Sequence, residues 1–193
     1  MRWLILIVAV PLVARAQWFV GAGPLHYRPE SADYRAVNRP AWGGTVLLMS
    51  RQYCHWWYGA RLEYSPLSLS PSRPTDRHGY TDAAFVAGEL RWFPWMPTSV
   101  PLYGSIALGL STIATSPSRD LPSRRAGGSM GFGYSVGIGG VLFYDSPCCG
   151  WWLDVALRYH APNAIARSKY RPVLSSVEAL VTFNYGLGGS NEK

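Results

Sequence analysis

The sequence is nearly free of lysine, which occurs only at Lys169 and Lys193. Lysine is common on solvent-facing strand surfaces and at sheet edges, so its scarcity disfavours a soluble β-protein. Long apolar runs are also lacking after Val13, and the run from Trp3 to Val13 is shorter than the ~20 residues that a spanning helix needs. If the rest of the chain contacts lipid, it must therefore do so as strands closed into a barrel.

The first 16 residues predict a cleaved secretory signal peptide. A basic start at Met1-Arg2 precedes the apolar run, and Ala14-Arg15-Ala16 supplies a small-residue cleavage site before Gln17. Export from the cytoplasm excludes nucleic acid as a partner. We expect a mature chain that begins at Gln17.

Stretches of alternating hydrophobicity follow one another along the mature chain, and this period of two indicates strands. They cover residues 17–27, 41–50, 55–65, 80–93, 101–112, 129–144, 150–160 and 174–187. Between them, long connections at 28–40, 66–79, 113–128 and 161–173 alternate with short ones at 51–54, 94–100 and 145–149. This alternation predicts an all-β fold: an eight-stranded antiparallel up-and-down transmembrane β-barrel over 17–187, with 188–193 as a short periplasmic tail.

The two faces of each stretch differ in chemistry. One face is apolar and carries aromatic residues near its ends, as membrane-interface girdles do: Trp56, Tyr64, Trp92, Tyr103, Tyr144, Trp151, Tyr159 and Tyr185. The other face is rich in glycine, serine and a few charges. We expect the apolar face to meet lipid and the second face to line the barrel.

The charged residues of the second face predict a network of ion pairs inside the barrel. An eight-stranded barrel is only wide enough for side chains to fill it, and buried charges need partners. The expected lumen charge network comprises Arg61, Glu63, Glu89, Arg91, Asp154, Arg158 and Glu178. A salt-bridged lumen is the favoured interpretation, with a proton or ion path as the alternative.

The cysteines fall in short connections that belong to one rim. Cys54 lies in the first, and Cys148 and Cys149 lie in the third. That rim faces the periplasm, where disulfides persist, so Cys54 can bridge to Cys148 or to Cys149, and one thiol is left over. No CxxC ligand set is present, so we predict no metal and no cofactor.

The long connections carry mostly basic residues. They are Arg28, Arg35, Arg39, Arg73, Arg77, Arg119, Arg124, Arg125, Arg167, Lys169 and Arg171. On the outside of an outer membrane they would meet outer-membrane lipid and the phosphates of lipopolysaccharide, which arginine contacts bidentately. A set of solvated loop charges is the alternative.

In its pattern of strands and connections the chain resembles the small outer-membrane barrels, namely the transmembrane domain of the OmpA type and its OmpX-like relatives. The resemblance covers about 17–187. It implies a non-enzymatic structural or accessory protein of the envelope, with envelope proteins as partners. One departure is that residues 188–193 follow the final aromatic alternation.

A local stretch is similar to lipid A 3-O-deacylase, an outer-membrane esterase of the same strand number. Arg158-Tyr159-His160-Ala161-Pro162-Asn163-Ala164 matches that family's R-x-x-H-x-S-N-A region, with one residue fewer between the arginine and the histidine. The likeness implies His160 as the base, Asn163 at the oxyanion site and Glu178 as the nearest acid. Pro162 stands where the family has its nucleophilic serine, and an ester hydrolase of this type needs that hydroxyl.

The sequence therefore favours a non-enzymatic integral outer-membrane barrel that serves as a structural or accessory interaction protein, alone or as a subunit of a larger membrane complex. A lipid A-modifying hydrolase and a soluble periplasmic lipocalin-like carrier are the alternatives. The missing serine disfavours the first of these, and the lysine-free strands disfavour the second.

Overall fold

The computed structural model describes residues 17–30, 40–53, 55–68, 80–95, 101–116, 127–142, 150–166 and 175–187. Its strands are β1 (Gln17–Pro29), β2 (Ala41–Tyr53), β3 (Trp56–Ser68), β4 (Tyr80–Trp92), β5 (Leu102–Ser116), β6 (Gly127–Leu142), β7 (Trp151–Ala166) and β8 (Ser176–Gly186). Each pairs antiparallel with the next, and β1 pairs with β8 to close the barrel. The predicted fold class is confirmed. The predicted signal peptide, tail and three cysteines lie outside the described residues.

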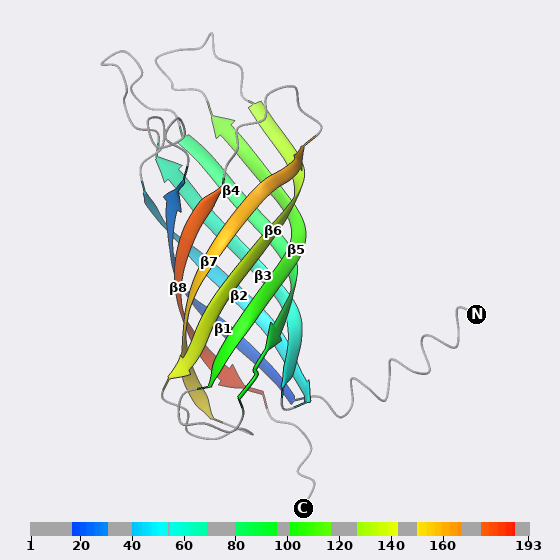
Figure 1. The fold of residues 1–193 in the computed structure, drawn as a ribbon. Coiled ribbons are helices and arrows are strands. Elements are labelled where there is room, and N and C mark those ends of the chain that lie inside the picture. The colour runs from blue at the N-terminus through cyan, green and yellow to red at the C-terminus, as the bar shows by residue number, and fades with distance from the viewer. Residues whose placement is uncertain are drawn as a thin grey trace, which may run out of the picture.

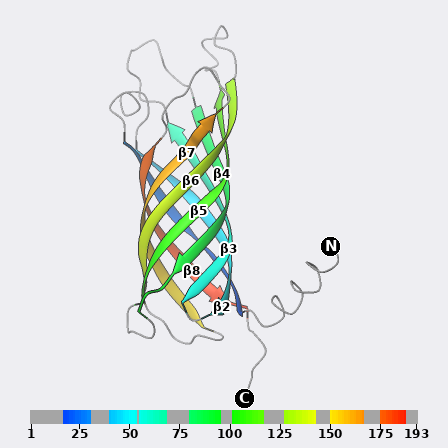
Figure 2. The ribbon, with the colours of Figure 1, turned by 45° about the vertical axis from the view of Figure 1, so that its right-hand side comes forward.

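The tilted strands form the wall of a tall, narrow barrel (Figures 1 and 2). Because neighbours are antiparallel, the connections 30–40, 69–79, 117–126 and 167–175 belong to one end, which we call the long-connection rim. The connections 54–55, 93–101 and 143–150 belong to the other end, the short-connection rim. β1 begins and β8 ends at this second rim (Figure 1).

Several strands run further toward the long-connection rim than the hydrophobic alternation predicts. β5 continues to Ser116 and β7 to Ala166, where the sequence pattern ends near 112 and 160. The backbone ladder continues there, as in the pairing of Thr115 with Gly127. Hydrogen bonding between neighbours does not depend on side-chain polarity, so it extends past the apolar band.

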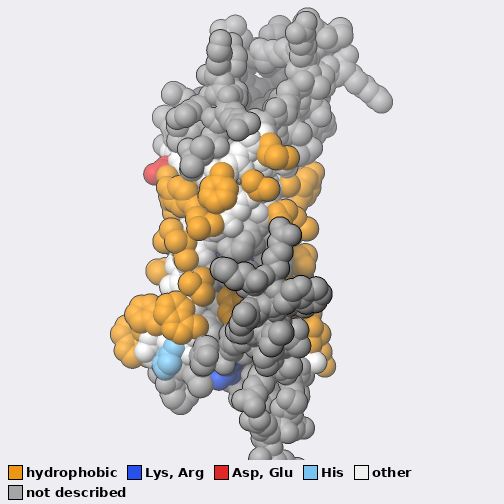
Figure 3. Space-filling view, turned by 90° about the vertical axis from the view of Figure 1, so that its right-hand side faces the viewer, with side chains coloured by type: hydrophobic (Ala, Val, Ile, Leu, Met, Phe, Trp, Pro, Cys, Tyr) orange, Lys and Arg blue, Asp and Glu red, His pale blue; other side chains and the backbone are white. Residues whose placement is uncertain are grey.

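Side chains alternate between the outside and the inside of the wall. Along β8 every second residue is buried and the residues between are exposed. The exposed ones are large and apolar, such as Val86, Leu108 and Phe183, which are 57%, 51% and 52% exposed. Where Figure 3 shows described residues, hydrophobic side chains gather along the wall, and the coloured charged side chains lie near its ends. Such an outer surface is suited to lipid.

An aromatic cluster occupies the lumen toward the short-connection rim. Phe19 packs edge-on against Trp57 and Trp152, with ring centroids 4.9 Å away in both cases. Phe93 lies 4.4 Å from Trp57 and 5.2 Å from Tyr103, centroid to centroid. These rings belong to one buried hydrophobic cluster, which fills this end of the barrel with side chains.

The prediction that Tyr103 belongs to the outer aromatic girdle is wrong. Its side chain is 2% exposed and points into the barrel, whereas the neighbouring Leu102 is 52% exposed. Aromatic character alone does not reveal the face, and the alternation of β5 assigns Tyr103 to the inside. The girdle residues Trp56, Tyr64, Trp92, Trp151, Tyr159 and Tyr185 are exposed, and Tyr144 lies outside the described residues.

Among the described residues, no helix has the length and apolar character needed to cross a membrane.

Candidate functional site

All seven residues of the predicted lumen charge network are buried inside the barrel. None is more than 3% exposed. They come from β3, β4, β7 and β8, and they follow one another along the barrel axis from Asp154, near the short-connection rim, to Glu178, near the opposite rim. The structure therefore brings together residues separated by more than a hundred positions in the sequence.

Glu89 is the centre of the network. Its Oε2 accepts a hydrogen bond from Arg61 Nη1 at 2.9 Å. Its Oε1 accepts from Arg91 Nε at 2.7 Å and from Arg158 Nη2 at 2.9 Å. Three guanidinium groups thus surround one carboxylate, which compensates for their removal from water through charge-assisted hydrogen bonds.

Toward the short-connection rim the network ends at Asp154. Arg91 Nη1 donates to Asp154 Oδ2 at 2.6 Å, and the Tyr103 hydroxyl donates to Asp154 Oδ1 at 2.6 Å. The Arg91 guanidinium lies 4.6 Å from the centre of the Tyr103 ring, a cation–π distance. Tyr103 therefore joins the aromatic cluster to the charges, a role that the sequence analysis missed because it assigned this residue to lipid.

Toward the long-connection rim the network continues through Glu63. Arg61 Nε lies 3.0 Å from Glu63 Oε1, and Arg158 Nη1 lies 3.4 Å from the same atom. Arg61 Nη2 also donates to Ser135 Oγ at 2.6 Å. Arg61 and Arg158 therefore each contact two carboxylates, Glu63 and Glu89.

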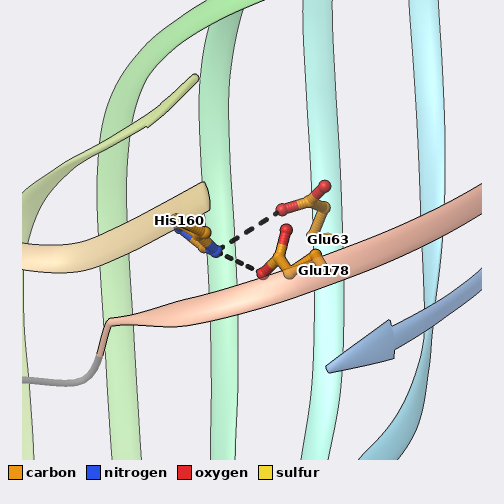
Figure 4. A group of neighbouring side chains, drawn as sticks. All are labelled: Glu63, His160 and Glu178. Atoms are coloured by element: carbon orange, nitrogen blue, oxygen red, sulfur yellow. Dashed lines mark hydrogen bonds and ion pairs between the residues drawn. The ribbon is translucent and has the colours of Figure 1, made fainter. Parts of the chain in front are cut away.

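His160 links the last carboxylate to the rest. Its Nδ1 lies 2.5 Å from Glu178 Oε1 and 4.0 Å from Glu63 Oε2 (Figure 4). The ring packs against Phe85 at a centroid distance of 4.5 Å. The sequence analysis considered His160 only as a catalytic base and left it out of the network. His160 follows Arg158 by two residues and so lies on the same face of the strand. This spacing was the signal that could have included it.

Glycines on β6 leave room for the large network side chains. A Cβ added at Gly137 would overlap the side chain of Arg158, and one added at Gly139 would overlap the ring of Tyr103. Both glycines lie on the face that the sequence assigns to the lumen. The glycine-rich face of β6 is thus the space into which Arg158 and Tyr103 fit.

The deacylase-like stretch lies at an irregularity in the sheet. Tyr134 pairs with Ala161 and Phe132 pairs with Ile165, so the register between β6 and β7 shifts across Pro162 and Asn163. Proline cannot donate a ladder hydrogen bond and is typical of bulges. Pro162, which stands where the similar family has its serine, therefore lies at an irregularity in the ladder, where a residue without a backbone N–H is tolerated.

The arrangement as a whole supports charge neutralisation and packing. Charged groups alternate along the lumen, and each arginine contacts at least two acceptors. Buried pairs of this kind stabilise a fold weakly in net terms, but the loss of one partner leaves an uncompensated charge and is costly. Removal of a single member is therefore expected to cost more than the network as a whole adds to net stability.

No family model and no curated protein matches this sequence. Solved structures do match it. Neisserial surface protein A superposes with a TM-score of 0.65 at 14% sequence identity, covering 87% of this chain and 96% of that chain. Ail, the attachment invasion locus protein of Yersinia pestis, gives a TM-score of 0.55 at 12% identity, with coverage of 89% and 98%. A major outer membrane protein from Thermus thermophilus gives 0.56 at 10% identity, with coverage of 89% and 99%.

The chain has the fold of the small outer-membrane barrels. The resemblance expected from the strand pattern is confirmed at this level. The apolar outer wall and the fold both agree with the predicted location in the outer membrane.

Proposed function

We propose that this chain is a non-enzymatic integral protein of the outer membrane that serves as a structural or accessory interaction protein of the envelope. The observation that carries the proposal is the occupied lumen: the aromatic cluster and the lumen charge network lie along the barrel axis inside a lipid-facing wall. A barrel filled in this way works through its surface and rims.

The occupied lumen also separates this function from the two alternatives. A lipocalin-like carrier needs a ligand cavity inside and a polar surface outside. The described side chains of this barrel instead fill the inside with aromatic rings and charged groups and are apolar outside. A deacylase of the similar family needs a serine at the position of Pro162. His160 instead lies inside the barrel in contact with Glu178.

Lipopolysaccharide is the lipid partner that the charge pattern favours. Arg28, near the end of β1 at the long-connection rim, is exposed, and the other basic residues predicted to meet lipopolysaccharide phosphates lie outside the described residues. A guanidinium at the long-connection rim can bind a lipopolysaccharide phosphate through two hydrogen bonds. We expect Arg28→Ala to weaken binding of phosphorylated lipopolysaccharide and to leave binding of its dephosphorylated form unchanged.

The proposal is tested by conductance and by capture of partners. Purified folded protein in a planar lipid bilayer should give no steady ion conductance, because side chains occupy its lumen. Cross-linking in intact cells, followed by purification in mild detergent, should recover defined envelope components. A stable open-channel conductance would contradict the proposal and would favour the ion path.

A further inference from the structure

The group Glu63, His160 and Glu178 sits at the end of the lumen charge network and has a surplus of metal-ligating atoms. One ligand atom from each residue lies within 4.8 Å of the others, and all three side chains are at most 5% exposed. The residues come from β3, β7 and β8, and their polar ends point toward one another (Figure 4). The closed barrel therefore brings three possible ligand side chains together at one buried place.

Buried polar atoms in this group lack partners. Among the described residues, Glu63 Oε2 and Glu178 Oε2 have no hydrogen-bond partner. Two hydroxyls beside the group, Thr45 Oγ1 and Ser176 Oγ, have none either. By register Thr45 lies opposite Glu63 and Ser176 lies opposite His160. Buried polar atoms are normally satisfied, so a cluster of orphans at one point indicates a missing occupant.

The charges of the network indicate the sign of that occupant. Among the residues whose burial the structure describes, the buried arginines are Arg61, Arg91 and Arg158, whereas the buried carboxylates are Glu63, Glu89, Asp154 and Glu178. With His160 neutral, one carboxylate is therefore in excess. The excess lies at the His160 end, because Glu178 makes its ion pair with His160 and with no arginine in the described part of the barrel. A cation bound there would offset a buried negative charge that is otherwise costly.

We propose that Glu63, His160 and Glu178 form a binding site for a divalent transition-metal ion of the zinc class. Imidazole nitrogen and carboxylate oxygen are ligands of zinc, at about 2.0–2.2 Å from the ion, so ligand atoms of one ion lie roughly 3–3.5 Å apart. The distances from His160 Nδ1 to the two carboxylates, 2.5 and 4.0 Å, lie on either side of this value. Small side-chain rotations therefore give a three-ligand site, in which neutral His160 binds the ion through Nδ1 and keeps its one ring proton on Nε2.

The hydroxyls beside the group complete the site. Three protein ligands leave a fourth zinc position for water. Thr45 and Ser176 flank the group by register and can hydrogen-bond to that water or to the ligating carboxylates, which orients them. The site lies toward the long-connection rim, away from the aromatic cluster. The proposal adds a ligand to the barrel and does not depend on its role as an interaction protein.

The test measures zinc retained by the whole protein. The full chain is refolded in detergent micelles with Zn²⁺, free ion is removed by gel filtration, and bound metal is measured by atomic emission. We expect one ion per chain. Outer-shell substitutions alone weaken metal sites 10–100-fold, so His160→Asn and Glu178→Gln should each weaken binding by about 100-fold or more. Co²⁺ in place of Zn²⁺ should give visible absorption that these variants lose.

Matched controls separate this site from surface histidines. His26→Asn and His55→Asn change histidines that lie outside the lumen charge network, and both variants should retain zinc. Each variant is first shown to be folded by a difference in its migration on an SDS gel with and without boiling. The isosteric Glu178→Gln keeps the test decisive if His160→Asn does not fold. The proposal is overturned if the folded wild type retains no zinc. It is also overturned if a folded His160→Asn or Glu178→Gln variant retains zinc as the wild type does.

Discussion

At the scale of single residues, one carboxylate organises the interior. Glu89 accepts hydrogen bonds from three arginines that belong to β3, β4 and β7. Each arginine contacts a second acceptor as well, but Glu89 is the group that all three share. Its removal therefore affects more of the interior than the loss of any other carboxylate of the lumen charge network.

We expect Glu89→Ala to destabilise the barrel by about 3–5 kcal/mol, because it leaves buried guanidinium groups with fewer partners. Urea unfolding in lipid vesicles, followed by tryptophan fluorescence, measures this change. Glu30→Ala is the control, since Glu30 is exposed at the long-connection rim, and it should change stability by less than about 0.5 kcal/mol. Equal effects of the two substitutions would contradict the assigned role of Glu89.

A second prediction concerns the space left by glycine. Gly137→Ala places a methyl group against Arg158, whereas nothing described lies within 4 Å of a Cβ at Gly104. We expect Gly137→Ala to cost about 1–3 kcal/mol through overpacking, and Gly104→Ala to be tolerated. Unfolding midpoints of the two variants, measured side by side, decide this. A neutral Gly137→Ala would show that the Arg158 side chain and the Leu157 carbonyl both have room to move.

At the scale of the strand, alternation separates two environments that lie one residue apart. β4 is an example: Phe85 is 2% exposed and Val86 is 57% exposed. The first packs on His160 inside the barrel, and the second faces lipid. A strand of this kind tolerates charge on one face and excludes it from the other.

Val86 lies in the middle of β4, so Val86→Arg places a charge near the middle of the apolar wall. The expected cost is about 2–4 kcal/mol, and Val86→Ile should be neutral. The yield of folded protein on refolding into lipid vesicles measures the effect. Normal insertion of the arginine variant would show that this face does not meet hydrocarbon.

The residues of β7 near its irregular pairing with β6 predict that the protein has no deacylase activity. Pro162 offers no hydroxyl, and His160 lies in the lumen beside Glu178. We expect purified protein to remove no 3-O-linked acyl chain from lipid A, as followed by mass spectrometry. Acyl loss that His160→Ala abolishes would instead establish a hydrolase and would contradict the structural role proposed for this barrel.

At the scale of the whole molecule, closure is what makes the fold stable in a membrane. The pairing of β1 with β8 leaves no free sheet edge, so the backbone groups of every described strand can bond to a neighbour on each side. Bonds at the rims extend this closure, as from Leu187 N to Trp18 O at 2.8 Å. Unfolding must therefore break the barrel as a unit.

We expect the folded barrel to survive SDS at room temperature and to migrate differently on a gel from a boiled sample. The reason is that a closed ladder of hydrogen bonds has no edge at which detergent can begin to separate strands. A chain that migrates identically with and without boiling would contradict a closed barrel. Recovery of the protein in a detergent-free soluble fraction would contradict its place in the membrane.

The sequence by itself determined the strands, their order and the face of most side chains. Period-two alternation involves only neighbouring residues, so it can be read directly from the sequence. The alternation of connection lengths follows from antiparallel pairing. This is why the inward positions of Arg61, Glu89 and Arg158 could be predicted from parity alone. The girdle assignment of Tyr103 failed because an aromatic ring suits both the membrane interface and a buried contact with Arg91.

Only the tertiary structure decided which charges meet. Partners such as Glu63 and Arg158 are separated by 95 residues, and the tilt and register that bring them together depend on all the strands closing at once. The same holds for Glu63, His160 and Glu178, whose spacing in the sequence follows no metal-ligand motif. Their convergence arises from the curvature of the closed sheet, which no local pattern encodes.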